Sequence, residues 1–380
     1  MTRLALTLML GACGFQVTAG SGSRDAGSDN AIDGDVADMM IDEMQPPIDG
    51  DRTDWWNPEW PHRRRITLDT STFTGAVTDF PILVRIPALA GVSVDGADIR
   101  FVSLDGTATY PYDLDSFSQL GSSAIWVRMS IVPSSADTEL WLYYGNSSAP
   151  PVASSAGVFA AGHVSVHHLG GLIDATNNGH NASNGVAGQV PSMNLSGRIG
   201  AARTFDGNDD YLSLANGDGA YDFTTTLYAS AWVRVAGFED QYQAIITKGD
   251  SSWRLARANT ADGVAYGWTN GGNTDNVFGD TPVANGAWHH VAVVQTPTTK
   301  YVYVDGALDQ SEQNVEQIDS NNFGVRFGMN EESTSGGARY WHGDLDEIRI
   351  SSTARDAHWI FAEHKTTDAA FTTVGVDEVY

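Results

Sequence analysis

Two acidic residues near the C-terminal end of the chain are the first candidates for chemistry. Asp344 and Asp346 are separated by one residue, so in a strand both carboxylates would lie on the same face. A retaining glycosidase cleaves a sugar bond with two carboxyl groups about 5–5.5 Å apart. The sequence holds no Gly-x-Ser-x-Gly elbow, no phosphate-binding glycine loop and no His-Glu-x-x-His zinc motif. A pair of carboxylates on one strand face is an arrangement that glycoside hydrolysis could use.

Two pairs of adjacent histidines are the second candidates. His167-His168 and His289-His290 lie in alternating apolar segments, so the two side chains of each pair should point to opposite faces of a strand. One histidine from each pair could meet the other in space and bind a transition metal ion. The alternative, which we favour, is that one member of each pair is buried with a hydrogen-bond partner and the other is exposed.

Asp and Asn side chains crowd two predicted turns, and they are the third candidates. Calcium binds about six to eight oxygens from such side chains, from loop carbonyls and from water. We therefore predict one structural calcium ion, although Asp and Asn are also common in turns for conformational reasons. The residues are Asp174, Asn177 and Asn178 in the first turn and Asp206, Asn208, Asp209 and Asp210 in the second.

The segments that must position these residues have the two-residue period of β-strands. Alternating apolar runs bounded by Gly, Pro, Asp and Asn recur along the chain, and only residues 355–365 have a helical pattern. The spacing predicts an all-β fold with two β-sandwich domains, at 53–155 and 156–370, and a C-terminal tail at 371–380. The 40 Gly, 11 Trp, 13 Tyr and 14 Phe agree with strands joined by many turns.

Four motifs mark the first predicted domain. They are WWNPEWPHRR at 55–64, DGADIRF at 95–101, YPY at 110–112 and LWLYYGN at 140–146. Together they resemble a secreted bacterial domain of unknown function, DUF2341, for which no catalytic residues are established. The Trp55, Trp56 and Trp60 side chains could stack on a sugar, because tryptophan is amphipathic. We favour packing within the domain for these three.

Five motifs mark the second predicted domain. They lie at 174–181, 205–212, 288–292, 303–306 and 346–350. In this order they resemble the laminin G-like, concanavalin A-like lectin/glucanase superfamily. The resemblance implies a jelly-roll β-sandwich that binds carbohydrate or protein at cell surfaces, often with one calcium ion. It also brings a late strand near the early loop. The predicted calcium ligands are then Asp174, Asn177, Asp206, Asp210 and Asp346.

The same resemblance weighs against catalysis. Glucanases of the superfamily carry three carboxylates on one strand, but here the third position falls on Ile348 or Arg349, and neither can deliver a proton. We therefore predict no catalytic residue and a binding module, with ligand contacts at Trp268, Tyr340 and Trp341 through aromatic stacking. Core packing would account for these three equally well. A polysaccharide-cleaving enzyme with another carboxylate arrangement and a purely structural envelope spacer are the alternatives.

The first fifty or so residues are predicted to serve export and tethering. Arg3, the apolar run 4–10 and the tetrapeptide Leu10-Gly11-Ala12-Cys13 resemble a bacterial lipoprotein signal over residues 1–13, whose cysteine becomes lipidated. An ordinary signal peptide is the alternative. Residues 14–52 carry nine acids against two arginines and few apolar residues, which predicts a disordered acidic linker. We expect an exported protein held at the outer membrane or cell surface by lipid on Cys13.

The overall charge limits the partners. The chain has 47 Asp and Glu against 21 Lys and Arg, a net charge of −26, and such a surface repels nucleic-acid phosphates and anionic lipid headgroups. A single cysteine precludes an intrachain disulfide. We expect a monomer that binds a glycan or a surface protein and meets the membrane only through its lipid anchor.

Overall fold

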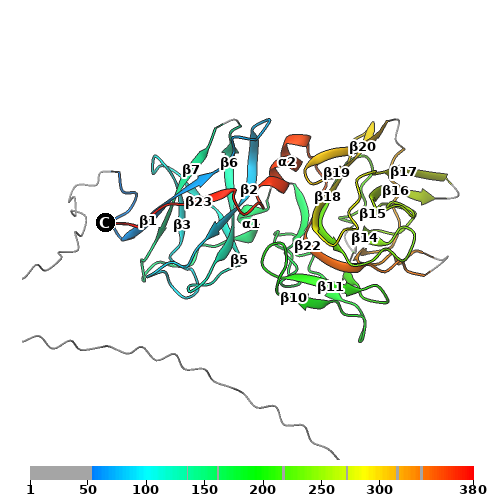
Figure 1. Ribbon diagram of the computed structural model, residues 1–380, viewed down its shortest axis with the longest axis horizontal. Coiled ribbons are helices and arrows are strands. Elements are labelled where there is room, and N and C mark those ends of the chain that lie inside the picture. Colours follow the sequence, from blue (N-terminus) through cyan, green and yellow to red (C-terminus); the bar gives the residue numbers. More distant parts are fainter. Residues whose placement is uncertain are drawn as a thin grey trace, which may run out of the picture. The chain divides into compact units, whose positions relative to one another are not determined.

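The computed structural model describes residues 54–380, except positions 135, 161, 216–218, 271–272, 314–315 and 334–336. The described strands form four antiparallel sheets, two in each of two β-sandwiches (Figure 1). The predicted all-β fold is confirmed, and both sandwiches belong to one compact unit, Asp49–Tyr380. Among the described residues, helices are too short or too polar to cross a membrane. Cys13 and the acidic linker lie outside the described residues.

The first sandwich is built from two sheets with strand orders β23-β1-β7-β3-β4 and β2-β6-β5, and β24 also pairs with β1. All of these pairings are antiparallel, as expected for strands joined by short turns. Its strands are β1 (His62–Leu68), β2 (Val77–Ile86), β3 (Arg100–Ser103), β4 (Thr109–Tyr110), β5 (Tyr112–Ser116), β6 (Ser123–Val132), β7 (Thr138–Tyr144), β23 (Thr372–Val374) and β24 (Glu378–Val379).

Strict alternation in β6 explains how one strand serves two packing layers. Ile125 and Val127 point into the core between the two sheets of the first sandwich. Ala124 and Trp126 point to the opposite face and belong to a separate buried cluster. Because side chains of a strand alternate between faces, a strand that is apolar on both faces must be covered on both. The second cover comes from the other sandwich.

The last ten residues differ from the predicted tail. β23 pairs with β1 through Ile66–Val374 and its neighbours, and β24 pairs with β1 at His62 and Arg63. Phe371 enters the core of the first sandwich, where its side chain is 1% exposed. Segments of two or three strand residues carry too little alternation to be recognised in a sequence. The first sandwich is therefore made from two separate stretches of the chain.

The second sandwich has one sheet in the order β10-β11-β22-β13-β18-β19-β20, with β8 also on β22, and a facing sheet in the order β17-β16-β15-β14-β21-β12-β9. Its strands are β8 (His163–His167), β9 (Ser183–Asn184), β10 (Ser192–Asn194), β11 (Ala202–Asp206), β12 (Leu212–Leu214), β13 (Leu227–Val235), β14 (Ala244–Thr247), β15 (Arg254–Arg257), β16 (Val264–Asn270), β17 (Asn273–Phe278), β18 (Trp288–Gln295), β19 (Thr299–Val304), β20 (Ala307–Gln313), β21 (Val325–Phe327) and β22 (His342–Ser351).

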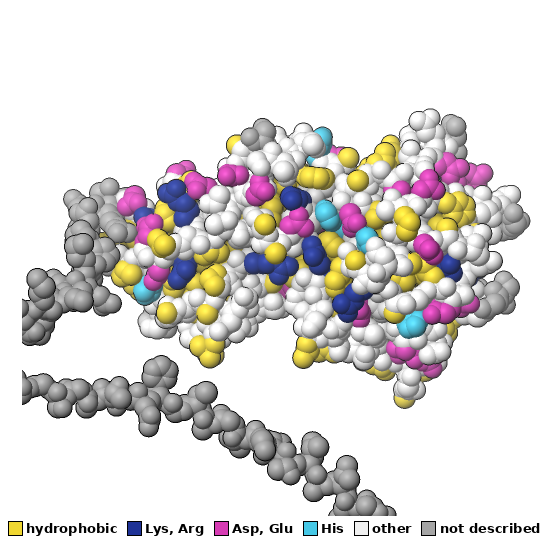
Figure 2. Space-filling model, viewed as in Figure 1, with side chains coloured by type: hydrophobic (Ala, Val, Ile, Leu, Met, Phe, Trp, Pro, Cys, Tyr) yellow, Lys and Arg dark blue, Asp and Glu magenta, His cyan; other side chains and the backbone are white. Residues whose placement is uncertain are grey.

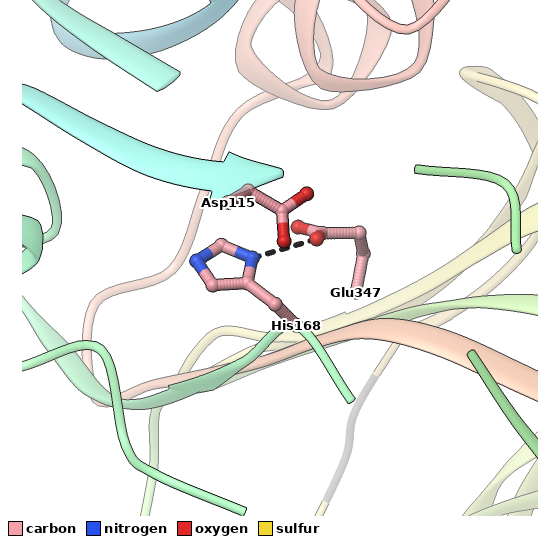
Figure 3. Close-up of side chains that lie close together, drawn as sticks. All are labelled: Asp115, His168 and Glu347. Atoms are coloured by element: carbon pink, nitrogen blue, oxygen red, sulfur yellow. Dashed lines mark hydrogen bonds and ion pairs between the residues drawn. The ribbon is translucent and has the colours of Figure 1, made fainter. Parts of the chain in front are cut away.

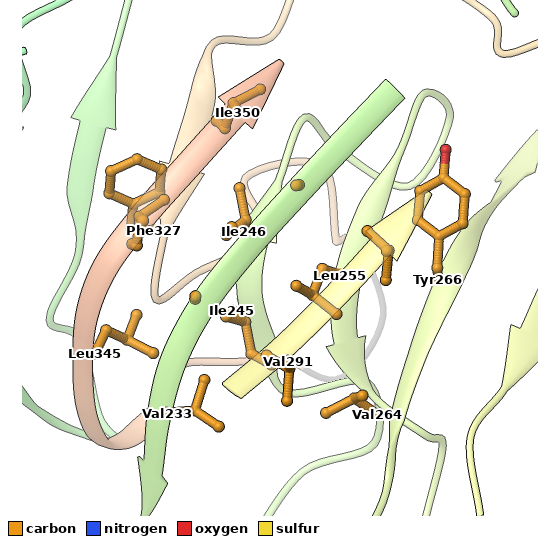
Figure 4. Packing of buried hydrophobic residues seen from close by; sticks show 14 of the residues in the cluster. Val233, Ile245, Ile246, Leu255, Val264, Tyr266, Val291, Phe327, Leu345 and Ile350 are labelled. Carbon is orange, nitrogen blue, oxygen red and sulfur yellow. The ribbon is translucent and has the colours of Figure 1, made fainter. Parts of the chain in front are cut away.

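The core of the second sandwich lies between these two sheets (Figure 4). Val233, Val291 and Leu345 come from the first sheet, and Ile246 and Leu255 come from the second. All five side chains are fully buried. Burying a side chain of this size stabilises the fold by about 1.5–3 kcal/mol. This core fixes the strands whose ends carry the polar residues described below.

Two short helices lie outside the sheets. α1 (Ser155–Val158) precedes the second sandwich, and α2 (Ala357–Lys365) follows its last strand, close to the predicted 355–365. The Asp356 side chain caps α2 by accepting from the Trp359 backbone N at 2.9 Å. The Trp359 ring then meets Phe80 of β2 edge to face at 4.8 Å, so α2 packs into the first core.

A buried apolar cluster joins the two sandwiches. Leu83 and Trp126, on the outer face of the β2-β6-β5 sheet, pack with Phe159, Val166 and Ile199. Leu83, Phe159, Val166 and Ile199 are each fully buried, and so is Trp126. The sandwiches therefore share a continuous interior at this junction.

Candidate functional site

The turn between β11 and β12 brings three carboxylates together. One oxygen each of Asp206, Asp209 and Asp210 lies within 4.8 Å of the other two. Gly207 opens the turn with φ +80°, and a Cβ at this position would stand 2.8 Å from the Cβ of His342. Only glycine allows both the left-handed conformation and this close approach. The turn therefore lies directly beside the start of β22.

Hydrogen bonds within the turn orient two of its carboxylates. Asp206 Oδ1 accepts from the Asn208 backbone N at 2.9 Å, and Asp206 Oδ2 accepts from the Asn208 side-chain amide at 3.0 Å. Asp210 Oδ2 accepts from the Asp206 backbone N at 3.1 Å. Such a cluster of hard oxygen atoms, completed by carbonyls and water, has the chemistry that calcium requires.

The electrostatics of the turn favour a cation. The bonds from Asn208 hold the pKa of Asp206 below its ordinary value. Burial raises the pKa of Asp210, and the charges of Asp206 and Asp209 add to that rise. A divalent cation at the turn would remove this repulsion between carboxylates.

Two tyrosines stand beside the turn. Burial raises the pKa of Tyr340, and the nearby charge of Asp209 raises it further, as does Tyr211. Both tyrosine side chains are partly exposed. We name Asp206, Asp209, Asp210, Tyr211 and Tyr340 the rim site. It offers oxygen ligands and aromatic faces together, which suits a polar ligand with flat apolar faces.

The other predicted calcium ligands lie elsewhere. Asp174 is buried, and its carboxylate accepts from the backbone N of Val166, Thr176 and His180 at 2.9–3.1 Å, which orders its own loop. Asn177 is exposed on that loop. Asp346 is fully buried, where it accepts from the Ile199 backbone N at 2.9 Å.

The five predicted ligands do not form one group. Only Asp206 and Asp210 lie together, and Asp209 joins them in place of the other three, Asp174, Asn177 and Asp346. The resemblance implied that the late strand would meet the early loop. Asp346 of that strand bonds instead to the backbone before β11.

Two of the three aromatic residues that were predicted to bind a ligand are buried. Trp341 is fully buried and Trp268 is 3% exposed, and both belong to the core of the second sandwich. The Lys300 Nζ lies 3.7 Å from the centre of the Trp268 ring and covers it from inside. Neither tryptophan can stack on an external ligand, so Tyr340 is the predicted contact that remains.

The carboxylate pair considered for glycoside hydrolysis is already engaged. Asp344 pairs with Arg234 at 2.6 Å and accepts from the Asn194 side chain at 3.1 Å. It also accepts a short hydrogen bond from Thr204 Oγ1. Asp346 is fully buried. These two carboxylates do not face each other across an open cleft.

The histidine pairs are only partly as expected. His290 is buried and its Nε2 lies 3.2 Å from Glu363 Oε1, while His289 is partly exposed, as predicted. His167 is fully buried, and neither of its ring nitrogens has a hydrogen-bond partner among the described residues. His168 bonds to two carboxylates, one of which, on Asp113, belongs to the first sandwich. Sequence alone gives no sign of that partner.

The tryptophan motif of the first sandwich mostly packs inward. Trp55 and Trp60 are 7% and 6% exposed, in a cluster of their own with Tyr143. Trp56 is partly exposed and lines a cavity of about 330 Å3 with Tyr110 among others. Trp56 also packs against this cluster, with its ring centre 5.2 Å from that of Trp60, so the predicted packing role holds for all three tryptophans.

The charged side chains have a visible arrangement on the surface. Figure 2 shows Asp and Glu over both sandwiches on the face in view, with Lys and Arg mostly in its middle. The acids outnumber the bases by 47 to 21 over the whole chain. An anionic ligand would therefore need a bound cation to approach the acidic rim site.

Two family profiles match the chain. Residues 206–361 match the concanavalin A-like lectin/glucanases superfamily, and residues 95–162 match the domain of unknown function DUF2341. Both predicted resemblances are confirmed by these matches. The first match begins at Asp206, the first carboxylate of the rim site. A search among curated proteins gave no match.

Several solved structures align with about half of the chain. The binding domain of Paraclostridial Mosquitocidal Protein 1 aligns at 13% identity and a TM-score of 0.42, over 50% of this chain and 48% of that one. The receptor binding domain of botulinum neurotoxin D aligns at 14% and 0.42, over 54% and 52%. Domain 4 of AbnA, a GH43 extracellular arabinanase from Geobacillus stearothermophilus solved with arabinotriose, aligns at 17% and 0.42, over 52% and 96%.

The alignments also differ in how much of the other chain they include. This chain spans about half the length of the mosquitocidal and botulinum domains, and nearly all of the arabinanase domain. With TM-scores below 0.5, these alignments say nothing about what this chain binds.

Proposed function

We propose that the second sandwich binds carbohydrate at the rim site, with a calcium ion held by the turn. The observation that carries the proposal is the group of three carboxylates within 4.8 Å at the surface turn, beside Tyr340. Calcium bound there takes oxygens from Asp206, Asp209 and Asp210 and keeps positions free for ligand hydroxyls.

The chemistry of the rim site suits a sugar better than an apolar peptide. The Tyr211 and Tyr340 rings offer flat apolar faces for stacking, and calcium binds vicinal hydroxyl pairs through oxygen. The site is a turn at the edge of the sandwich, so it accepts the end or side of an extended glycan. A neutral glycan avoids the repulsion expected from the net charge of −26.

The setting of this binding module is proposed from the N-terminal residues. Lipid on Cys13 would hold the protein at the outer membrane or cell surface, and the acidic segment 14–52 would extend it outward because like charges repel. The first sandwich then acts as a support on which the binding sandwich is mounted. The protein works as a monomer in this proposal.

A glycan-array screen of the chain, with calcium and with a chelator, tests the proposal. We expect binding that needs calcium and is lost in both Asp209→Asn and Tyr340→Ala. Trp56→Ala is the matched control, because Trp56 lines a cavity in the other sandwich and leaves the rim site intact. Loss of binding only in Trp56→Ala would move the glycan site to the first sandwich.

Other outcomes would favour the alternatives. Absence of glycan binding under both conditions would support a spacer or a protein-binding role. Release of cleaved sugar that stops in Asp344→Asn would support a polysaccharide-cleaving enzyme, despite the ion pair of Asp344 with Arg234.

A further inference from the structure

A second polar cluster lies at the junction of the two sandwiches (Figure 3). Asp113 and Asp115 belong to β5 of the first sandwich. His168 directly follows β8, and Glu347 lies in β22, both in the second sandwich. Three distant parts of the sequence therefore build this junction cluster.

His168 has a carboxylate at each ring nitrogen. Its Nδ1 lies 2.6 Å from Glu347 Oε1, and its Nε2 lies 3.1 Å from Asp113 Oδ2. One ligand atom each of Asp115, His168 and Glu347 lies within 4.8 Å of the other two. Figure 3 shows the Asp115 carboxylate pointing toward the same edge of the ring as that of Glu347. A histidine whose second nitrogen bonds to a carboxylate is the usual arrangement beside a bound metal ion.

Asp115 is the acid of the junction cluster with a carboxylate oxygen that accepts no hydrogen bond from the described residues. This oxygen is Oδ2, and it is buried. A buried carboxylate oxygen without a donor is unfavourable unless a cation or proton meets it.

The fixed cations near the carboxylates are Arg349 and Arg85, and the charge of Arg85 acts on both Asp115 and Glu347. Arg349 lies 3.1 Å from Glu347 Oε2, but it also serves Glu363 at 3.5 Å. Asp346, the neighbour of Glu347, is also fully buried. The junction cluster therefore gathers several acidic side chains around His168 at a largely buried place.

Glu347 reaches the junction cluster through a bulge in β22. The register between β13 and β22 shifts between Ser230 and Trp232, opposite this residue. Glu347 has φ +48°, which is uncommon for a residue with a long side chain. A bulge re-aims a side chain that regular alternation would direct elsewhere.

We propose that Asp115, His168 and Glu347 bind a divalent transition-metal ion such as Zn2+. His168 supplies Nδ1 and the two acids supply one oxygen each, while Asp113 orients the imidazole through Nε2. The nitrogen ligand favours zinc over calcium, which takes oxygen ligands. The ion bonds to residues of both sandwiches and so fixes one to the other.

Zinc titration of the metal-free chain tests this proposal, with a chromophoric chelator as competitor. We expect one zinc ion per chain at the junction cluster. Asp115→Asn should weaken the affinity for zinc by about 100-fold or more. Asp113 only orients His168, so Asp113→Asn should weaken that affinity by about 10–100-fold. Asp209→Asn at the rim site and His342→Gln on the surface are the matched controls and should leave zinc affinity unchanged.

A second readout guards against a variant that folds poorly. The visible absorption of Co2+ in place of Zn2+ reports its ligands, so His168→Gln should change that spectrum. Circular dichroism shows whether Asp115→Asn keeps the β-fold. If Asp115→Asn is unfolded, the zinc titration is done with His168→Gln instead. Absence of zinc binding in the wild type, or equal affinity in wild type and variant, overturns the proposal. Because Asp209→Asn abolishes only calcium-dependent glycan binding, the two proposals fail separately.

Discussion

Phe371→Ala should destabilise the first sandwich strongly, although this residue follows the second sandwich in the chain. Phe371 is 1% exposed and stacks on Phe73 with ring centres 5.9 Å apart and planes 17° apart. Its carbonyl also accepts from the Asp69 backbone N at 2.9 Å. Truncating a buried Phe costs about 3–5 kcal/mol. That is a large share of the roughly 5–15 kcal/mol that stabilises a domain.

Urea unfolding followed by tryptophan fluorescence measures this loss. The chain has two cores, so two transitions can appear, and Trp60 and Trp141 report the first sandwich. With a urea dependence of about 1–3 kcal/mol per M, the transition of the first sandwich should move by more than about 1 M. The matched control is Val376→Ala, since Val376 is 79% exposed and should change stability by less than about 0.5 kcal/mol.

The same experiment can refute the assignment of Phe371 to the first core. If Phe371→Ala and Val376→Ala both unfold at the wild-type midpoint, then residues 371–380 do not pack against β1 in solution. A shift confined to the transition of the second sandwich would also contradict the pairing of β23 with β1.

Three further predictions concern buried groups. Glu363→Ala should cost about 3–5 kcal/mol in urea unfolding, because it removes one of the two carboxylates that pair with buried Arg349 and the acceptor of Ser230 Oγ; an unchanged midpoint would count against these contacts. Burial lowers the pKa of His163 to about 3 from 6.5, so the unfolded chain binds the proton first and stability falls as pH drops below about 6.5. Replacing His163 by Gln should reduce that slope by up to about 1.4 kcal/mol per pH unit, and an identical pH profile would disprove it. Gly343→Ala should lower the melting temperature, because its Cβ would meet the Arg234 carbonyl oxygen at 2.2 Å; normal stability would argue against that register.

Period-two patterns were sufficient to predict the fold class and most of the strands. β6 and β18 are ten and eight residues long and rich in Val, Ile and Trp, and such a length and composition distinguish strands from turns. The same patterns do not tell which covering layer a strand will meet. Trp126 and Trp268 both lie in alternating strands, yet one packs at the junction and the other inside the second sandwich.

The candidate sites were predictable only where their residues are close in sequence. Asp206 and Asp210 belong to one turn, so their proximity follows from chain geometry. The meeting of Asp115 with His168 and Glu347 depends on how two domains pack, and no local pattern encodes that. Trp341 was predicted to contact a ligand but lies in the core of the second sandwich. Its sequence position does not distinguish a core aromatic residue from a ligand-binding one.

The return of β23 and β24 to β1 has a consequence for synthesis on the ribosome. Until residues 372–379 emerge, β1 can pair only with β7 and keeps one row of backbone groups open. The nascent first module is then an unfinished sheet with an exposed edge, the kind that invites intermolecular association. The second sandwich can fold during this time, so the first sandwich is synthesised first but completed last.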